Sequence, residues 1–283
     1  MAHGQTAAEP SSAAKPRTYA LVAAIGEHFD QVHEVQSTGS HLSPFRHKAS
    51  TVPNNALNRL ALHSLDKAIA SIDPSSTRIY LTLPPAQMDG VPPWQRDSVA
   101  IASVVAALDK YPQRSEWDRI LVATPAYRSL DQNGMAGKLQ GFGIFNEPLC
   151  QAGCENSLLP GPGREIIPEP PDGIPAMTMD DQPIKARTYI APFSYIEVWV
   201  LDPKTLAVLD KQQVFDSQKL AEPSYKPPLN VSDADMQKYL AGRFVNLVEL
   251  SIGEAVMHSE VNLRNGKAEV GPVKVIEPND EKK

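Results

Sequence analysis

The run Tyr19-Ala-Leu-Val-Ala-Ala-Ile25 is apolar at every position and ends at Gly26. A strand buried on both faces has this continuous apolar pattern, whereas a half-exposed strand alternates apolar and polar residues. Comparable strand patterns follow at Arg78 to Pro84 and at Trp117 to Thr124. Between these strands, apolar residues at helical spacing predict one helix from Asn54 to Ile72 and another from Pro92 to Leu108.

The order of strand, helix, strand, helix and strand is typical of parallel strands joined by right-handed crossovers. The sequence therefore predicts an α/β protein with a three-layer core and a largely parallel sheet. A fourth strand is expected from Leu139 to Phe145, where Gly141 and Gly143 indicate a bulge or a close approach by another group.

The C-terminal part of the chain predicts an antiparallel hairpin over residues 188–215, turning at Asp202 to Thr205, and then a long helix beginning near Ser232. Alternation along the first hairpin strand places Tyr195 and Trp199 on its exposed face. As domains we expect a disordered leader at 1–17, a single α/β domain at 18–265 with a proline-rich insertion at 150–186, and a C-terminal tail at 266–283.

Charge and hydropathy exclude two classes of partner. The chain has 283 residues, with 27 Lys and Arg against 33 Asp and Glu, and a formal net charge of −6. No stretch concentrates the positive residues, so we expect no nucleic-acid partner. No window approaches the roughly 18 consecutive apolar residues of a membrane-spanning helix, so we expect no membrane span.

The N-terminus and the cysteines indicate the compartment. The first residues, MAHGQTAAEPSSAAKP, resemble the flexible leader of a chain whose signal peptide has been removed; a disordered cytosolic tail is the alternative. Cys150 and Cys154 have neither zinc nor thioredoxin spacing, and Gly153 allows them to form a loop-closing disulfide. This predicts a periplasmic or secreted protein, although two unpaired cytosolic thiols would also fit the pattern.

The proline-rich segment from Cys150 to Lys185 cannot hold regular structure for long, yet it is more apolar than a free linker. We predict that it packs across the edge of the sheet or over the crevice near residues 125–143, fastened at its start by the cysteine pair.

Four histidines follow the first strand: His28, His33, His41 and His47. In an open α/β sheet, ligands bind beyond the carboxyl ends of the strands. The cluster therefore predicts a divalent metal site, such as zinc, with His28, Asp30, His33 and His41 as ligands. Glu27 or Glu34 would then be the catalytic base. Solvated loop and edge-strand histidines are the competing explanation, because no spacing here matches a metal motif.

A second polar group follows the third strand and suits an anionic or hydrogen-bonding ligand. Its members are Tyr127, Arg128, Asp131, Lys138 and Gln140. A polar loop with glycines for turn geometry is the competing explanation. The sequence contains neither the G-x-S-x-G of serine hydrolases nor the glycine-rich loops of nucleotide-binding proteins.

Three segments carry a family resemblance: TYALVAAIGEHFDQVHEVQSTGSHL, DRILVATPAYRSLDQNGMAGKLQGFGIF and PFSYIEVWVLDPKTLAVLD. The chain resembles a group of uncharacterised exported or lipid-anchored proteins of Gram-negative bacteria. This resemblance implies export and assigns no catalytic residue.

Two functions follow as hypotheses. The first is a periplasmic or cell-envelope protein of unknown activity that binds a small molecule or an envelope protein. The second is a metal-dependent hydrolase whose site follows the first strand.

Overall fold

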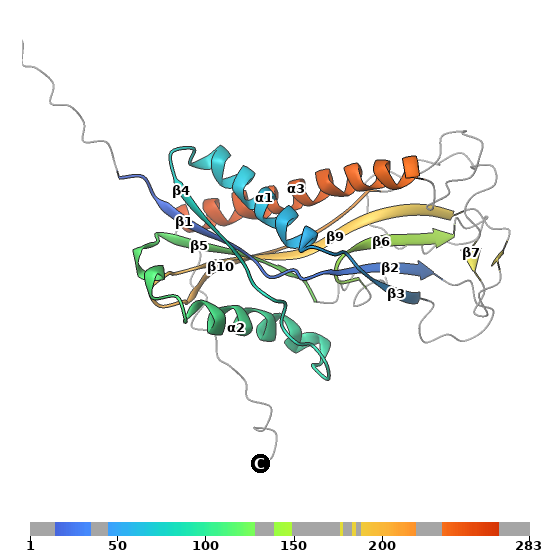
Figure 1. Cartoon of the computed structure of the whole chain (residues 1–283), viewed down its shortest axis with the longest axis horizontal. Helices are drawn as coiled ribbons and strands as arrows, with labels where there is room; N and C mark the ends of the chain where they lie inside the picture. The colour runs from blue at the N-terminus through green and yellow to red at the C-terminus, as the bar shows by residue number, and fades with distance from the viewer. Residues whose placement is uncertain are drawn as a thin grey trace, which may run out of the picture.

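The computed structural model describes residues 15–34, 45–127, 139–148, 176–177, 183–184, 188–218 and 234–265. Figure 1 shows three main helices around a long sheet. The elements in chain order are β1 (Thr18–Ala23), β2 (His28–Glu34), β3 (Phe45–Thr51), α1 (Ala56–Ile72), β4 (Thr77–Thr82), η1 (Pro93–Gln95), α2 (Arg96–Leu108), η2 (Pro112–Glu116), β5 (Arg119–Pro125), β6 (Gly141–Pro148), β7 (Ala176–Met177), β8 (Pro183–Ile184), β9 (Thr188–Leu201), β10 (Val208–Ser217) and α3 (Ala234–Arg264).

The main sheet has the strand order β3-β2-β6-β9-β5-β1-β4, and β10 pairs with β9. The predicted α/β class, the hairpin of β9 and β10 and the long helix α3 are confirmed. The expected largely parallel sheet is instead mixed. Only β1 with β4, β1 with β5 and β2 with β6 are parallel pairs among the described strands.

The strand β9 joins two halves of this sheet. Its residues 188–195 pair with β6 and its residues 196–201 pair with β5. Because β10 occupies the opposite edge of β9, β5 and β6 must run end to end along the same edge. The next strands are divided between the same two halves of the sheet: β1 pairs with β5 in one half, and β2 pairs with β6 in the other.

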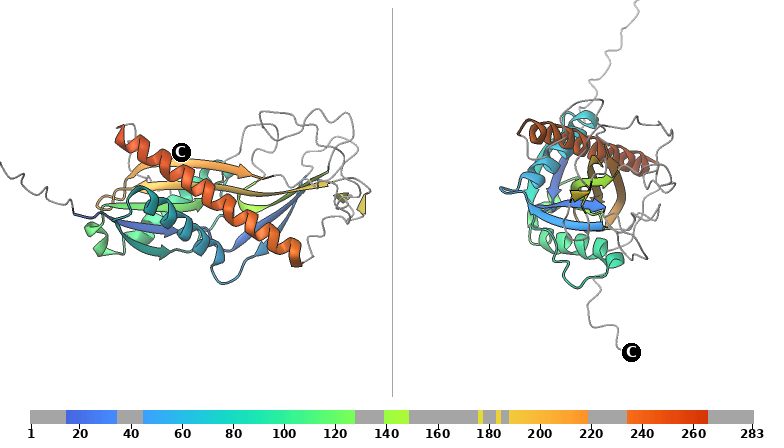
Figure 2. Two further views of the ribbon diagram at one scale, coloured as in Figure 1. Left: turned by 90° about the horizontal axis from the view of Figure 1, so that it is seen from above. Right: turned by 90° about the vertical axis from the view of Figure 1, so that its right-hand side faces the viewer.

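Helices lie against both faces of the half that contains β1 and β5. On one face, α1 and α3 pack on Leu21, Leu121 and Val198. On the other face, α2 packs on Val22, Val122 and Trp199. Figures 1 and 2 show α1 and α3 together on one side of the sheet and α2 on the opposite side.

Residues 28–34 and 45–51, for which no strand was predicted, form β2 and β3. Their sequences, HFDQVHE and FRHKAST, mix charged and apolar residues because they lie at one end of the sheet order. The glycine signal in β6 is confirmed as a close approach. A Cβ at Gly143 would lie 2.1 Å from the backbone oxygen of Asp30 and 2.5 Å from the ring of Phe193.

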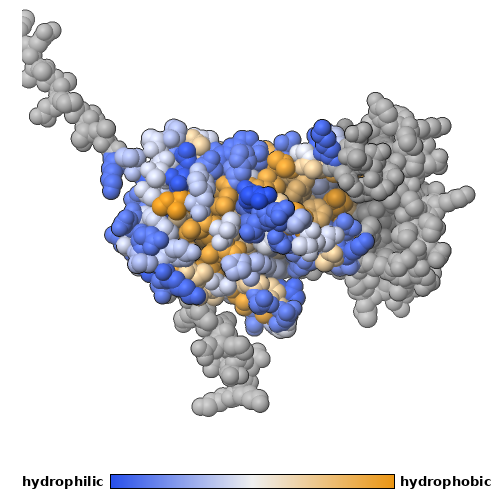
Figure 3. Space-filling view, viewed as in Figure 1, coloured by the Kyte–Doolittle hydropathy of each residue, from blue (hydrophilic) through white to orange (hydrophobic). Residues whose placement is uncertain are grey.

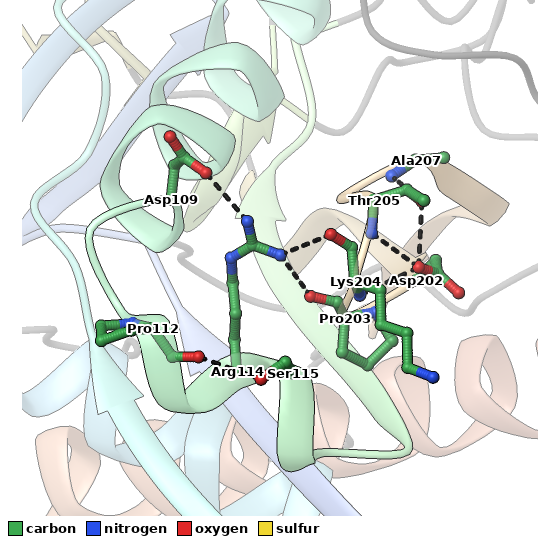
Figure 4. A network of polar contacts seen from close by, with 9 residues as sticks. All are labelled: Asp109, Pro112, Arg114, Ser115, Asp202, Pro203, Lys204, Thr205 and Ala207. Atoms are coloured by element: carbon green, nitrogen blue, oxygen red, sulfur yellow. Dashed lines mark hydrogen bonds and ion pairs between the residues drawn. The ribbon is translucent and has the colours of Figure 1, made fainter.

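The turn between β9 and β10 is fastened to η2 by one arginine (Figure 4). Arg114 Nη1 donates to the carbonyl oxygens of Pro203 at 2.5 Å and Lys204 at 2.7 Å. Asp202 Oδ1 accepts hydrogen bonds from the backbone N–H groups of Lys204 and Thr205, which closes the turn and lowers the pKa of Asp202. These contacts fasten the turn between β9 and β10 to η2.

Candidate functional site

Two of the predicted ligand-binding residues form hydrogen bonds with the first turn of α2. Tyr127 follows the end of β5 by two residues and Gln140 directly precedes β6, so they lie at the junction where these strands meet end to end along β9. The backbone N–H of Tyr127 donates to Asp97 Oδ1 at 3.3 Å. Arg96 Nη1 donates to Gln140 Oε1, also at 3.3 Å. The other predicted members, Arg128, Asp131 and Lys138, lie outside the described residues.

A buried carboxyl pair lies directly beneath this turn. Glu197 of β9 is fully buried, and Asp97 of α2 is 5% exposed. The Asp97 carboxyl is close enough to Glu197 to raise the pKa of that group. Lys211 of β10 lies beside both, with its Nζ 2.8 Å from Glu197 Oε1 and 3.6 Å from Asp97 Oδ2. The hairpin of β9 and β10 and the helix α2, which is distant in sequence, thus bring two acids and one base together.

Burial changes the proton affinity of two groups here. It raises the pKa of Glu197 to about 7, with the charge of Lys211 opposing the rise and the nearby charge of Asp97 adding to it. Burial likewise raises the pKa of Tyr127 to about 12, with Arg96 opposing. Near neutral pH, Glu197 therefore exchanges a proton while Tyr127 remains a protonated donor.

Aromatic side chains surround the cluster on the same face of the hairpin. Lys211 Nζ lies 4.6 Å from the ring centroid of Trp199, at cation–π distance. The indole N–H of Trp199 donates to Thr124 Oγ1 at 3.0 Å. The Tyr195 hydroxyl accepts from Gln213 Nε2 at 2.8 Å.

The predicted exposure of Tyr195 and Trp199 is wrong, because they are 1% and 5% exposed. Alternation correctly placed both on one face of β9. That face is covered, however, since Trp199 packs in a core cluster with Ile101 and Leu108 of α2. Glu197, between them in the same alternating series, is buried for the same reason.

Sequence reasoning missed Arg96, Asp97, Glu197 and Lys211 as site residues. One signal was available in the hairpin register, which pairs Glu197 with Gln213 and Trp199 with Lys211. Residues on one face of an antiparallel pair also contact their diagonal neighbours. A hairpin turning at 202–205 therefore places an acid and a base within reach of each other.

The predicted metal cluster is brought together only in part. His47 Nδ1 lies 2.7 Å from Asp30 Oδ2, and Asp30 is 1% exposed with no hydrogen-bond partner at its Oδ1. His28 is exposed in β2, and His33 belongs to the same strand. His41 lies outside the described residues. Within the described ranges, no group of three or more His, Cys, Asp or Glu could hold a metal ion. The metal site stays a prediction, and His47 is the partner of Asp30.

The two predicted bases have different surroundings. Glu27 Oε1 accepts a hydrogen bond from the backbone N–H of Asn55 at 3.1 Å, whereas Glu34 ends β2. Glu27 lines a surface cavity of about 490 Å³ at the carboxyl ends of β1 and β4. Asn58, which sequence reasoning missed, also lines this cavity. Its Oδ1 accepts hydrogen bonds from the backbone N–H groups of Ile25 and Gly26.

The cysteine pair, Cys150 and Cys154, lies outside the described residues. So does most of the segment predicted to cover the crevice, apart from β7 and β8. Among the described helices, none is long and apolar enough to cross a bilayer.

Comparison with known proteins gives no family. No family model matches the sequence, and no curated protein matches it. Among solved structures, a Xanthomonas campestris protein of family DUF330 is similar with a TM-score of 0.35 and 8% identity, over 91% of this chain and 94% of that chain. A Helicobacter pylori protein described as a neuraminyllactose-binding hemagglutinin homolog has a TM-score of 0.37 and 8% identity, over 92% of this chain and 97% of that chain. Likeness at this level carries no functional argument.

Proposed function

We propose that this chain is a periplasmic or cell-envelope α/β protein that binds a small molecule or an envelope protein at the junction between β5 and β6. The observation that carries the proposal is the cluster of buried Asp97 and Glu197 with half-buried Lys211 beneath that junction. Buried ion pairs add little stability over apolar residues of similar size. Titratable groups with displaced pKa values are, in contrast, typical of functional sites as well as of structural ion networks.

The groups next to the cluster define the ligand chemistry. Arg96 is held in place by Gln140 and by the carbonyl of Val91, which accepts from its Nε at 3.0 Å. Tyr127 supplies a protonated hydroxyl. The N-terminus of α2 adds the positive end of its helix dipole. These donors suit a ligand that carries a carboxylate or another hydrogen-bond acceptor, and Arg128, Asp131 and Lys138 would complete its contacts.

The experiment is an NMR titration of the ¹⁵N-labelled full chain with succinate and, separately, inorganic phosphate. We expect shifts that begin at the amides of Tyr127 and Gln140 and saturate. Arg96→Met should weaken binding at least tenfold, because it removes the guanidinium, whereas Arg59→Met at an exposed position of α1 should not. No saturable shift at Tyr127 or Gln140 with either probe would refute the proposed anion site.

The proposed compartment has an independent test. Its support is the composition of the leader and the spacing of Cys150 and Cys154. Mass spectrometry of unreduced protein from its native host should give a mass two hydrogen atoms below that of the dithiol form. Two alkylatable thiols in that preparation would refute export to an oxidising compartment.

The site lies in what we propose to be a single domain over residues 18–265, with a three-layer core of helix, sheet and helix and the insertion at 150–186. Limited proteolysis tests this organisation together with the predicted cover. One resistant fragment spanning the domain would support both. Rapid cleavage between Pro160 and Pro175 would refute the cover.

A metal-dependent hydrolase is the second proposed function, favoured by one observation. Asp30 engages His47 through Nδ1, which is how a carboxylate orients a histidine whose Nε2 binds a metal. With His41 and other residues outside the described ranges as further ligands, a zinc ion there would lower the pKa of a bound water to about 7. Elemental analysis of natively purified protein should then give one zinc per chain, lost on His47→Ala. Absence of stoichiometric transition metal would refute this function.

A further inference from the structure

The long helix α3 has apolar side chains on two opposite sides. One side is buried against the sheet and includes Leu247, Val248, Ile252 and Val256. The other side carries an exposed series, which we call the outer stripe: Tyr239 at 46%, Leu250 at 70%, Met257 at 59% and Val261 at 54% exposure. Figure 2 (left) shows α3 running diagonally over the outside of the molecule, and Figure 3 shows apolar patches at the surface.

The outer stripe is straight and symmetric about its middle. Tyr239, Leu250 and Val261 are spaced by eleven residues, close to three full turns of 3.6 residues, so they line up along the helix. Leu250 lies midway between the other two. A twofold interface needs this kind of self-complementary surface, in which each residue meets a counterpart on a second copy.

We propose that the outer stripe is a homodimer interface, in which α3 packs antiparallel against α3 of a second copy, with the twofold axis at Leu250. The two copies of Leu250 then face each other, and Tyr239 of each copy faces Val261 of the other.

The charges along α3 favour the antiparallel orientation. Lys238 and Arg243 lie in its first half, whereas Glu254 and Glu260 lie in its second half. An antiparallel pair brings Arg243 of one copy within one turn of Glu254 of the other, and Lys238 within one turn of Glu260. A parallel pair would place like charges together. Arg243 already stacks over Tyr239, with its guanidinium 5.1 Å from the ring centroid, so its charge is held beside the stripe.

The surface around Leu250 also offers a place for the facing side chain. A cavity of about 720 Å³ is lined in part by Asn246, Leu247, Leu250 and Gly253. Asn246, Leu250 and Gly253 line one wall of this cavity and Lys67, Ala68 and Ser71 of α1 line another, so a side chain of the partner helix would enter between α3 and α1. Gly253 has no atom within 4 Å of where its Cβ would lie, so the helices can approach closely there.

Analytical ultracentrifugation of the full chain tests the proposal. We expect a monomer–dimer equilibrium whose dissociation constant rises at least tenfold in Leu250→Lys. Val245→Lys is the matched control, because Val245 is 36% exposed on the same helix but outside the stripe. A wild-type chain that remains monomeric at about 100 μM, or a dimer that Leu250→Lys leaves intact, would overturn the proposal.

Cysteine cross-linking tests the axis without relying on that variant. In a background of Cys150→Ser and Cys154→Ser, Leu250→Cys should form a covalent dimer under mild oxidation, because the axis brings this position next to itself. Met257→Cys should not, because its counterpart across the axis is Arg243. Equal cross-linking at both positions would show random collision and overturn the predicted geometry.

Discussion

Replacing Glu197 by glutamine should change how stability depends on pH. The pKa of Glu197 is raised from 4.5 to about 7 in the folded protein, mainly by burial. At about 1.4 kcal/mol per pKa unit, this rise corresponds to roughly 3 kcal/mol. Because the folded state holds the proton more tightly than the unfolded state, its contribution is fully present below about pH 4.5 and is lost as the pH rises to about 7.

Glutamine keeps the shape of the side chain but cannot ionise. We therefore expect the stability of Glu197→Gln relative to the wild type to rise by about 3 kcal/mol between pH 4.5 and pH 8. Urea denaturation at several pH values measures this difference, and the titrating groups that do not contact Glu197 cancel when the two proteins are subtracted. Gln113→Asn, which exchanges one neutral amide for another at an exposed position of η2, is the control and should give a flat difference. A flat difference for Glu197→Gln too would refute the raised pKa.

Four further substitutions test the packing and the polar contacts. Gly143→Ala should destabilise the fold by about 3 kcal/mol or more, because its Cβ would overlap backbone and the Phe193 ring, and thermal unfolding measures the loss. Gly242→Ala, which has open space in α3, should instead stabilise by about 0.5–1 kcal/mol, and a loss there would contradict this account. Arg114→Ala removes two hydrogen bonds to the hairpin turn and should cost about 1–3 kcal/mol in urea denaturation; no change would show that the turn holds without it. Thr124→Val leaves a buried indole N–H without its acceptor and should cost a similar ~1–3 kcal/mol, with a change in tryptophan fluorescence; an unchanged spectrum would contradict the contact.

The sequence predicted best the elements whose pattern is local. The apolar run at Tyr19, the two helices that follow it and the hairpin turn at Asp202 each depend on neighbouring residues, and all were found within a few positions. The strands β2 and β3 were missed because their mixture of charged and apolar residues lacks a clear alternation. The mixed sheet was missed because β9 pairs with strands distant in sequence, and no local pattern specifies which strand a partner will be.

The candidate site was predicted in part for a related reason. The rule that ligands lie beyond the carboxyl ends of strands led to Tyr127 and Gln140, which do approach each other through the first turn of α2. Glu197 looked like the exposed member of an alternating strand, since alternation gives the face of a residue but not what covers that face. Its burial depends on α2 and β10 together.

Because β5 and β6 meet only along β9, the order in which the chain is synthesised determines when the sheet can close. Even the earlier pairing of β1 with β5 joins residues as far apart as Tyr19 and Arg119, and such distant pairings slow folding. Until residues 188–201 are available, the apolar edges of β5 and β6 have no strand to cover them, and open edges of this kind recruit other chains. A chain that stops before residue 188 should therefore aggregate instead of folding into a smaller sheet.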